Sequence, residues 1–163
     1  MSAVLIAGIG NVFLGDDGWG VEVVRRLAER ELPAGVRAVD YGIRGVHLAY
    51  DLLEGDVEVL ILVDAVPTGE PPGTVCLLEL DDQTRAELAA DGATVDSHAM
   101  HPQAVLAALE ALGGHVGRIL VIGCQPQTLE PGMALSPVVA ATVEPALGLV
   151  LETAAAARPV EAR

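Results

Sequence analysis

The sequence is poor in aromatic residues, in cysteine and in basic residues, and each shortage narrows what the protein can be. Aromatic residues make up 2% of the 163 residues, against 52% for hydrophobic residues as a whole, so the predicted core is aliphatic. The two cysteines, Cys76 and Cys124, lie far apart inside apolar runs, and neither belongs to a C-x-x-C pair. This usage argues against a disulfide framework and predicts two buried, reduced thiols in a cytoplasmic protein.

Long uncharged hydrophobic runs are also missing. No apolar run of 18 residues is free of charge or proline, so no membrane-spanning segment is predicted. The N-terminus has neither a basic region nor a small-residue cleavage site, and we do not expect it to be a signal peptide. The 9 basic residues face 23 acidic ones, for a net charge of −14. This charge repels nucleic acid and anionic membranes and attracts a cationic peptide or a metal ion, although it serves equally well for solubility alone.

Short β-rich runs alternate with helical stretches along the chain. The run at 57–66 is apolar on both faces, which is typical of a central strand. Pro145 is expected to bend or break the last helix, and the polar segment 81–96 has no clear pattern. Strands are predicted over 3–9, 36–41, 57–66, 74–80 and 118–124, and helices over 17–32, 45–55, 101–114 and 136–157.

This alternation predicts one α/β domain built as a three-layer sandwich. A mostly parallel, twisted sheet of about five strands is expected to carry helices on both faces. We assign the domain to residues 1–157 and a flexible tail to residues 158–163. A domain of this length buries roughly 70% of the surface of its unfolded chain, so its core can hold it together without cross-links.

A glycine-rich turn, GNVFLGDDGWG, follows the first predicted strand. Two phosphate-binding patterns fail at this turn. Gly8 and Gly10 match the start of G-x-G-x-x-G, but Phe13 stands in place of the third glycine. Gly10 and Gly15 match the P-loop spacing, but Asp16 stands in place of the lysine. Because a carboxylate repels a phosphate, we expect no nucleotide here.

The two aspartates in this turn suggest a cap and a ligand. Asp16 is the better placed to satisfy backbone N–H groups at the start of the following helix. Asp17 would then remain available near the carboxyl end of the first strand. The alternative is that both acids only complement the helix dipole.

Asp64 and His98 are the other candidate ligands. Asp64 interrupts the apolar run VLILVDAV near its carboxyl end, where open α/β sheets collect ligands. A buried aspartate is costly unless it is paired or binds a metal, although it can also cap a loop. His98 lies in a polar loop and is less suited to capping than His101, and its alternative is an ordinary surface histidine. Two carboxylates and an imidazole suit a divalent cation such as Ni²⁺ or Zn²⁺.

Four motifs together resemble the hydrogenase maturation endopeptidases, the proteases that process the large subunit of nickel–iron hydrogenases. They are GIGNVFLGDDGWG, LILVDAV, SHAMHPQAVL and GCQPQTLEPGMALSPVV, and they span about residues 4 to 150. The resemblance implies a metal site formed by Asp17, Asp64 and His98. It also implies that this site recognises nickel already installed in the precursor, from which the protease removes a C-terminal peptide.

The chemistry of cleavage stays open at this level. The sequence has no G-x-S-x-G nucleophile elbow and no H-E-x-x-H zinc motif. Either a carboxylate activates water, with Asp17 the first candidate base and Asp16 the second, or the nickel polarises the scissile carbonyl. The nickel would come with the substrate, so no resident cofactor is expected. Two alternatives are a nickel-binding maturation scaffold that never cuts and a small-molecule metallohydrolase with its own zinc.

The segment DYGIRG differs from a common form of the family, in which a glycine pair with threonine follows the second strand. Tyr41 and Ile43 replace two of those residues, while Gly42 and Gly45 still allow a tight loop. The resemblance associates this loop with the choice of hydrogenase. Gly42, Arg44 and Gly45 are therefore the candidate residues for recognising the precursor, with Arg44 suited to a carboxylate. An ordinary strand–helix turn is the alternative.

Overall fold

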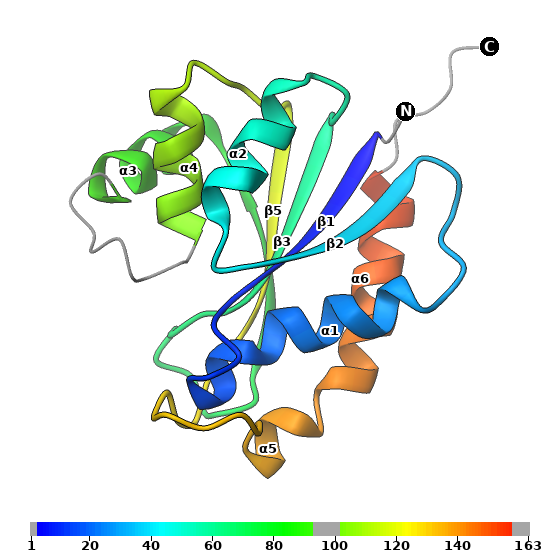
Figure 1. Cartoon of the computed structure of the whole chain (residues 1–163), viewed down its shortest axis with the longest axis vertical. Helices are drawn as coiled ribbons and strands as arrows, with labels where there is room; N and C mark the ends of the chain where they lie inside the picture. The colour runs from blue at the N-terminus through cyan, green and yellow to red at the C-terminus, as the bar shows by residue number, and fades with distance from the viewer. Residues whose placement is uncertain (1–2, 93–101, 158–163) are drawn as a thin grey trace.

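The computed structural model describes residues 3–92 and 102–157, and side chains within those ranges except at 88–92 and 102–104. Strands and helices alternate along this part of the chain, as Figure 1 shows. The strands are β1 (Val4–Ile9), β2 (Val36–Gly42), β3 (Val59–Ala65), β4 (Val75–Leu80) and β5 (Arg118–Cys124). The helices are the 3₁₀ helix η1 (Gly15–Gly18), α1 (Trp19–Ala28), α2 (Gly45–Leu53), α3 (Asp82–Gly92), α4 (Pro102–Ala111), α5 (Pro137–Ala140) and α6 (Val143–Ala157).

The strands form one sheet in the order β2-β1-β3-β5-β4. All neighbouring pairs are parallel except β4 with β5, which is antiparallel. The prediction of a mostly parallel sheet of about five strands is therefore confirmed. Every residue of β3 is buried, as expected of the central strand. The chain leaves β1 toward β2 and later returns to β3 on the other side of β1, so the strand order reverses between β1 and β3.

Helices cover both faces of this sheet, which confirms the three-layer architecture (Figure 1). Val4 and Ile6 of β1 point to the layer that contains α1 and α6. Leu5 and Ala7, which alternate with them, point to the layer of α2 and α4. Both layers are packed with Val, Leu, Ile and Ala, in agreement with the scarcity of aromatic residues.

Glycines let the first helix lie unusually close to the sheet. A Cβ on Gly20 would lie 2.0 Å from the carbonyl oxygen of Val63 and 2.7 Å from that of Ile9. A Cβ on Gly8 would lie 2.8 Å from the Cβ of Val24. Because no side chain separates them, the start of α1 meets the carboxyl ends of β1 and β3 directly.

Trp19, the one tryptophan of the sequence, joins the start of α1 to the C-terminal part of the chain. Its ring is fully buried, and its Nε1–H donates a hydrogen bond of 2.9 Å to Oγ1 of Thr142. The Thr142 hydroxyl donates in turn to the carbonyl of Val139, at 2.7 Å. These contacts hold the link between α5 and α6 against α1.

Three local predictions are corrected by the structure. The segment predicted as one helix over 136–157 is divided between α5 and α6, and the break precedes Pro145 rather than falling on it. Pro145 lies in the first turn of α6, where a backbone N–H has no partner within the helix and its loss costs little. Cys76 is half-buried rather than buried, because β4 is an edge strand with a largely exposed face, whereas Cys124 is buried as predicted. The segment predicted as a helix over 17–32 begins as η1 and ends with α1 at Ala28, before the polar residues that follow.

Candidate functional site

The glycine turn after β1 places Asp17 at the carboxyl edge of the sheet. Gly10 has a φ of 142°, and a Cβ there would lie 1.9 Å from the backbone oxygen of Asp17, so the position requires glycine. The backbone N–H of Asn11 donates to Oδ2 of Asp17 at 2.8 Å. The Asn11 side chain accepts a hydrogen bond of 2.9 Å from the N–H of Phe13 and closes the turn. The carboxylate of Asp17 is thus oriented by backbone that Gly10 and Asn11 shape.

Asp64, near the end of β3, is the most unusual side chain at this edge. It is fully buried, and neither carboxylate oxygen has a hydrogen-bond partner among the described residues. Burial, reinforced by the negative charge of Asp17, raises the pKa of Asp64 well above its ordinary value. The nearby N–H of Ala65 opposes this rise only weakly. A buried carboxylate without partners destabilises the fold, so its presence needs a compensating use.

Asp17 and Asp64 both lie where the strand order reverses, between β1 and β3, and they are near enough for the charge of Asp17 to raise the pKa of Asp64. A Cβ placed on Gly10 would lie 3.7 Å from Oδ1 of Asp64, so the same turn that orients Asp17 also borders Asp64. The structure therefore brings together two of the three predicted metal ligands. His98 lies outside the described residues, as does His101. Within the described part of the chain, no group of three His, Cys, Asp or Glu residues is arranged to hold a metal.

Asp16 has a different environment from its neighbour. It is fully buried, and its carboxylate accepts hydrogen bonds from the backbone N–H groups of Gln127, Thr128 and Ser136 and from the Ser136 hydroxyl, at 2.7 to 3.1 Å. Burial alone would raise the pKa of Asp16, but these hydrogen bonds outweigh it and lower the pKa below the ordinary value. The prediction that Asp16 caps its own helix is wrong: η1 has no side-chain cap, and the carboxylate binds a segment more than 100 residues away.

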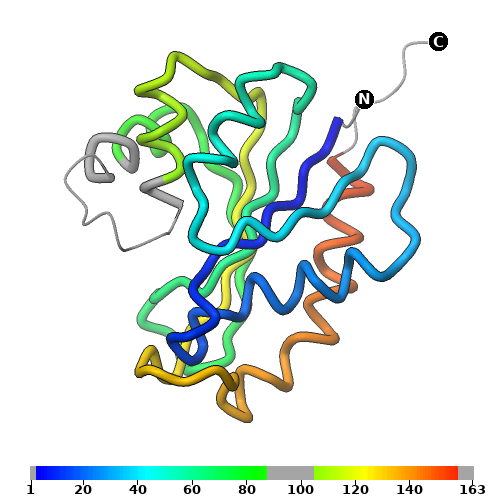
Figure 2. The backbone as a smooth tube through the Cα atoms, viewed as in Figure 1, coloured from blue at the N-terminus to red at the C-terminus, as the bar shows by residue number. Residues whose placement is uncertain are grey.

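Backbone contacts extend this connection between the turn and the loop that follows β5. The N–H of Gly15 donates to the carbonyl of Gly132, the N–H of Gly132 donates to that of Phe13, and the N–H of Asp16 donates to that of Thr128. Figures 1 and 2 both draw the two segments side by side below the sheet. This pairing could not be predicted, because the residue pattern of 124–136 indicates only a loop.

The loop after β2 also reaches the candidate site. Gly42 has a φ of 53°, and its carbonyl accepts a hydrogen bond of 3.0 Å from the N–H of Gly10. Arg44 donates from Nη2 to the carbonyl of Asp40 at 2.9 Å and from Nε to that of Tyr41 at 3.3 Å. Gly45 is buried at the start of α2. The three residues predicted to recognise a partner thus lie in a loop that contacts the glycine turn.

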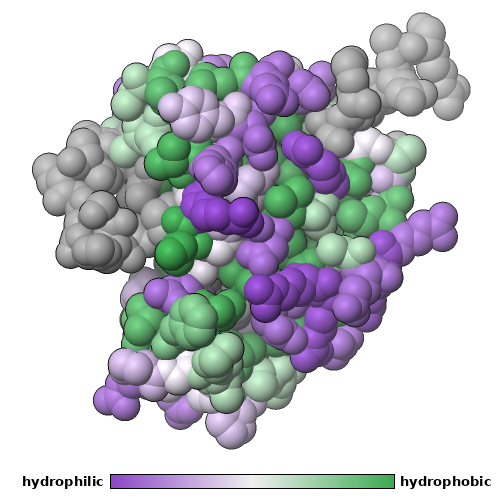
Figure 3. All heavy atoms as spheres, viewed as in Figure 1, coloured by the Kyte–Doolittle hydropathy of each residue, from purple (hydrophilic) through white to green (hydrophobic). Residues whose placement is uncertain are grey.

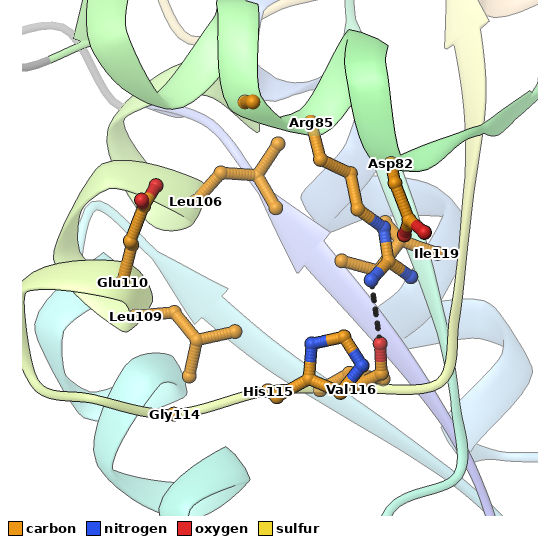
Figure 4. Close-up of a pocket in the computed structure, with 10 residues that line it drawn as sticks. Asp82, Arg85, Leu106, Leu109, Glu110, Gly114, His115, Val116 and Ile119 are labelled. Atoms are coloured by element: carbon orange, nitrogen blue, oxygen red, sulfur yellow. Dashed lines mark hydrogen bonds between the residues drawn. The ribbon is translucent and has the colours of Figure 1, made fainter.

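A cavity of about 250 Å³ lies near the start of β5, the end of the strand away from Asp64 (Figure 4). Arg85 crosses it and donates to the carbonyls of Val116 and Gly117, at 2.7 and 3.1 Å. Ile119 forms part of its wall near the start of β5, whereas Asp64 pairs with Gly123 near the end of that strand. This cavity is therefore remote from Asp17 and Asp64.

None of the helices in the described ranges combines the length and the apolar character needed to cross a membrane. Asp17 and Asp64 place two carboxyl groups at this edge of the sheet, and negative charge there attracts cations rather than anions.

Sequence comparisons connect the chain to known proteins. The family model described as hydrogenase maturation protease matches residues 21–153. The hydrogenase expression/formation protein HupD of Rhodobacter capsulatus is 41% identical over 143 residues, which are 86% of this chain and 66% of that protein. The hydrogenase 2 maturation protease of Escherichia coli strain K12 is 34% identical over 150 residues, which are 91% of this chain and 88% of that protein.

Solved structures give the same grouping. The E. coli hydrogenase maturating endopeptidase HybD superposes with a TM-score of 0.76 and 32% identity, covering 96% of this chain and 93% of that one. The hydrogenase 2 maturation peptidase from Thaumarchaeota archaeon SCGC_AB-539-E09 superposes with a TM-score of 0.71 and 34% identity, covering 94% and 99%. The architecture described above is thus shared over nearly the whole length of each chain.

Proposed function

The chain belongs to the hydrogenase maturation protease family, a family of peptidases, and from this membership we propose its specific task. It is an endopeptidase that removes the C-terminal peptide from the precursor of a nickel–iron hydrogenase large subunit. It acts after nickel insertion and recognises the installed metal through Asp17, Asp64 and His98. Family membership supports the class of reaction, and the geometry at the end of β3 supports the role of the metal.

The unpartnered carboxylate of Asp64 is the observation that carries this proposal. An aspartate that is fully buried without a hydrogen-bond partner among the described residues destabilises the fold. The carboxylate of Asp17 lies near enough to raise the pKa of Asp64 further. A divalent cation brought between these two groups would offset both the burial and the mutual repulsion. The nickel of the precursor is such a cation, and it belongs to the substrate.

The proposed ligands are chemically suited to nickel. Carboxylate oxygens from Asp17 and Asp64, together with one imidazole nitrogen from His98, form a mixed oxygen–nitrogen set that accepts a borderline divalent metal. Three ligands from this protein leave the remaining ligands of the nickel to the precursor. Recognition would thus depend on the metal being present in the substrate.

Peptide cleavage then follows one of two routes. Asp17 acts as a general base that activates a water molecule, or the nickel polarises the scissile carbonyl. Asp17 is the first candidate because it lies half-buried at the edge of the site. Asp16, the second candidate at the level of sequence, has its carboxylate occupied by four hydrogen bonds from the loop after β5. We therefore assign Asp16 the role of holding the site together.

Gly42, Arg44 and Gly45 are proposed to recognise the precursor. Their loop contacts the glycine turn through the hydrogen bond between Gly10 and Gly42. A change of sequence in this loop would therefore alter the surroundings of the site without altering the proposed metal ligands Asp17, Asp64 and His98.

The test is cleavage of a nickel-loaded large-subunit precursor followed by intact-mass measurement. The wild-type protein is expected to shorten the precursor only when nickel is present. Asp17→Ala and His98→Ala are expected to fold normally and to leave the precursor at its original mass. Normal processing by the Asp17→Ala/His98→Ala double variant would refute the proposed site. An unchanged precursor with wild-type protein would favour a nickel-binding scaffold, and tight stoichiometric zinc with activity on small amides would favour a metallohydrolase.

A further inference from the structure

A groove of about 290 Å³ lies next to the candidate site. Gly10 and Asn11 of the glycine turn form one wall, α1 contributes Arg25, and the end of β2 with its loop contributes Asp40 to Arg44. The wall formed by Gly10 and Asn11 is shared with the site, because the Asn11 N–H binds the carboxylate of Asp17. A chain lying in this groove would therefore pass close to Asp17 and Asp64.

The groove is basic, although the protein as a whole is strongly acidic. Arg25 and Arg44 line the groove and Arg37 lies on the adjoining strand β2, while the net charge of the chain is −14. Figure 3 shows strongly hydrophilic side chains gathered over β2 and α1 on the face drawn. Arg26 and Arg30 are ion-paired with Glu144 instead and lie outside this cluster.

The charges of Arg25 and Arg44 are only partly neutralised. The Nε of Arg25 lies 3.0 Å from the carboxylate of Asp40, and the Arg25 side chain is 59% exposed. Arg44 donates only to the neutral carbonyls of Asp40 and Tyr41 among the described residues, so no carboxylate offsets its charge there. Within the groove, two guanidinium groups thus face one carboxylate. Because these hydrogen bonds fix their positions, the two arginines form an oriented site for an anion.

Other features of the groove suit an extended peptide. Phe13 and Ile43 are 62% and 57% exposed and form part of its lining, so they offer apolar contacts on either side. Among the described strands, β2 lies at the edge of the sheet and its outer side pairs with none of them. An extended chain can enter along such an edge without displacing any element.

We propose that this groove binds the C-terminal segment that the enzyme removes, and that Arg25 and Arg44 recognise a carboxylate on that segment. The carboxylate is the α-carboxylate of the chain end or an acidic side chain near it. This inference rests on the proposed function for the identity of its ligand. It adds a binding site for the leaving peptide to the site that recognises the metal.

Binding of a synthetic peptide tests the inference without requiring cleavage. The probe is a fluorescently labelled peptide with the sequence of the C-terminal extension of the nickel–iron hydrogenase large-subunit precursor that is used in the cleavage test. Its dissociation constant is measured by anisotropy at low salt. Arg25→Gln/Arg44→Gln is expected to weaken binding at least tenfold, and Arg44→Lys, which keeps the charge, is expected to weaken it less than Arg44→Gln. Arg118→Gln is the matched control, because Arg118 forms an exposed ion pair with Glu79 at the far end of β5, and it should bind like wild type.

Two modified peptides identify the source of the carboxylate. If a C-terminal amide abolishes the difference between wild type and the double variant, the α-carboxylate is recognised. If replacing acidic side chains by amides abolishes the difference, a side chain is recognised. Equal binding of the unmodified peptide by wild type and the double variant, with both proteins folded, would overturn the inference.

The outcome separates the two proposals. Arginine-dependent binding without cleavage of the nickel-loaded precursor would contradict the proposed function and retain the groove as a peptide site. Cleavage of the precursor together with peptide binding that does not depend on the two arginines would support the proposed function and overturn the groove as the peptide site.

Discussion

Asp64 is predicted to cost the metal-free protein stability, and Asp64→Asn measures that cost. The side chain is fully buried and has no hydrogen-bond partner among the described residues. Asparagine has nearly the same shape but carries no charge, so it removes both the burial of a charge and the repulsion from Asp17. Asparagine remains a buried polar group without a partner, so the substitution removes only the cost that is linked to the charge, and each unit by which the folded-state pKa is raised corresponds to about 1.4 kcal/mol. Because the pKa of Asp64 is raised well above its ordinary value, we expect Asp64→Asn to raise the free energy of unfolding by about 1 kcal/mol or more near neutral pH.

The stabilisation of the protein by Asp64→Asn should increase as the pH rises. The pKa of Asp64 is raised in the folded protein, whereas it keeps its ordinary value of about 3.8 in the unfolded chain. Below that value both states hold the proton, so the substitution removes no charge and its benefit is smallest. As the pH rises above it, the unfolded chain loses the proton first and the wild-type protein becomes progressively less stable. The advantage of Asp64→Asn should therefore grow with pH.

Urea unfolding in the presence of a chelator, followed at several pH values, is the assay. Asp56→Asn is the control, because Asp56 is exposed and its substitution should change stability by less than about 0.5 kcal/mol. Processing of the precursor by Asp64→Asn should be lost even though the fold is more stable, since function and stability make opposite demands on this side chain. A decrease of about 1 kcal/mol or more in the free energy of unfolding on Asp64→Asn would show that the carboxylate stabilises the fold, and it would refute the reasoning.

Three other substitutions probe the surroundings of the site. Asp16→Asn should destabilise the protein by about 2–4 kcal/mol in urea unfolding, because an amide nitrogen would replace one of two oxygens that together accept four hydrogen bonds; a change below 0.5 kcal/mol would contradict this. Gly20→Ala should cost about 3 kcal/mol or more because its Cβ would meet the backbone of β3, whereas Gly148→Ala, in an open part of α6, should be neutral or stabilising by up to about 1 kcal/mol. Burial and the hydrogen bond to Asp51 raise the pKa of Tyr41 well above its ordinary value, so ultraviolet titration should show a phenol that ionises later than a free tyrosine. The stability linked to its proton should be complete below about pH 10 and fall above it, and Tyr41→Phe should abolish the late transition; its persistence would contradict the assignment.

The sheet was predictable because its signals are local. The apolar run that forms β3 indicates a central strand. Asp64 is the one charged residue inside that run, and its expected burial already marks it as a candidate ligand. The glycine turn likewise indicates where the chain leaves β1. Each of these inferences uses only the chemistry of a few consecutive residues.

The different environments of the Asp16 and Asp17 side chains could not be predicted from the sequence. The two residues are adjacent and chemically identical, and only their partners separate them. The partners of Asp16 lie in the loop after β5, more than 100 residues away. Arg25 was missed as a candidate for the same reason, because its position in the groove depends on the approach of α1 to β2.

Trp19 gives this molecule a built-in optical probe. It is the one tryptophan of the sequence, it is fully buried, and it lies two residues after Asp17 and against the link between α5 and α6. Its fluorescence therefore reports on the junction where the start of α1 meets the C-terminal helices, with no second indole to obscure the signal. A shift of its emission to longer wavelength would mark the opening of that junction, and the timing of the shift relative to the loss of helical signal would show whether this edge of the sheet opens before the rest of the fold.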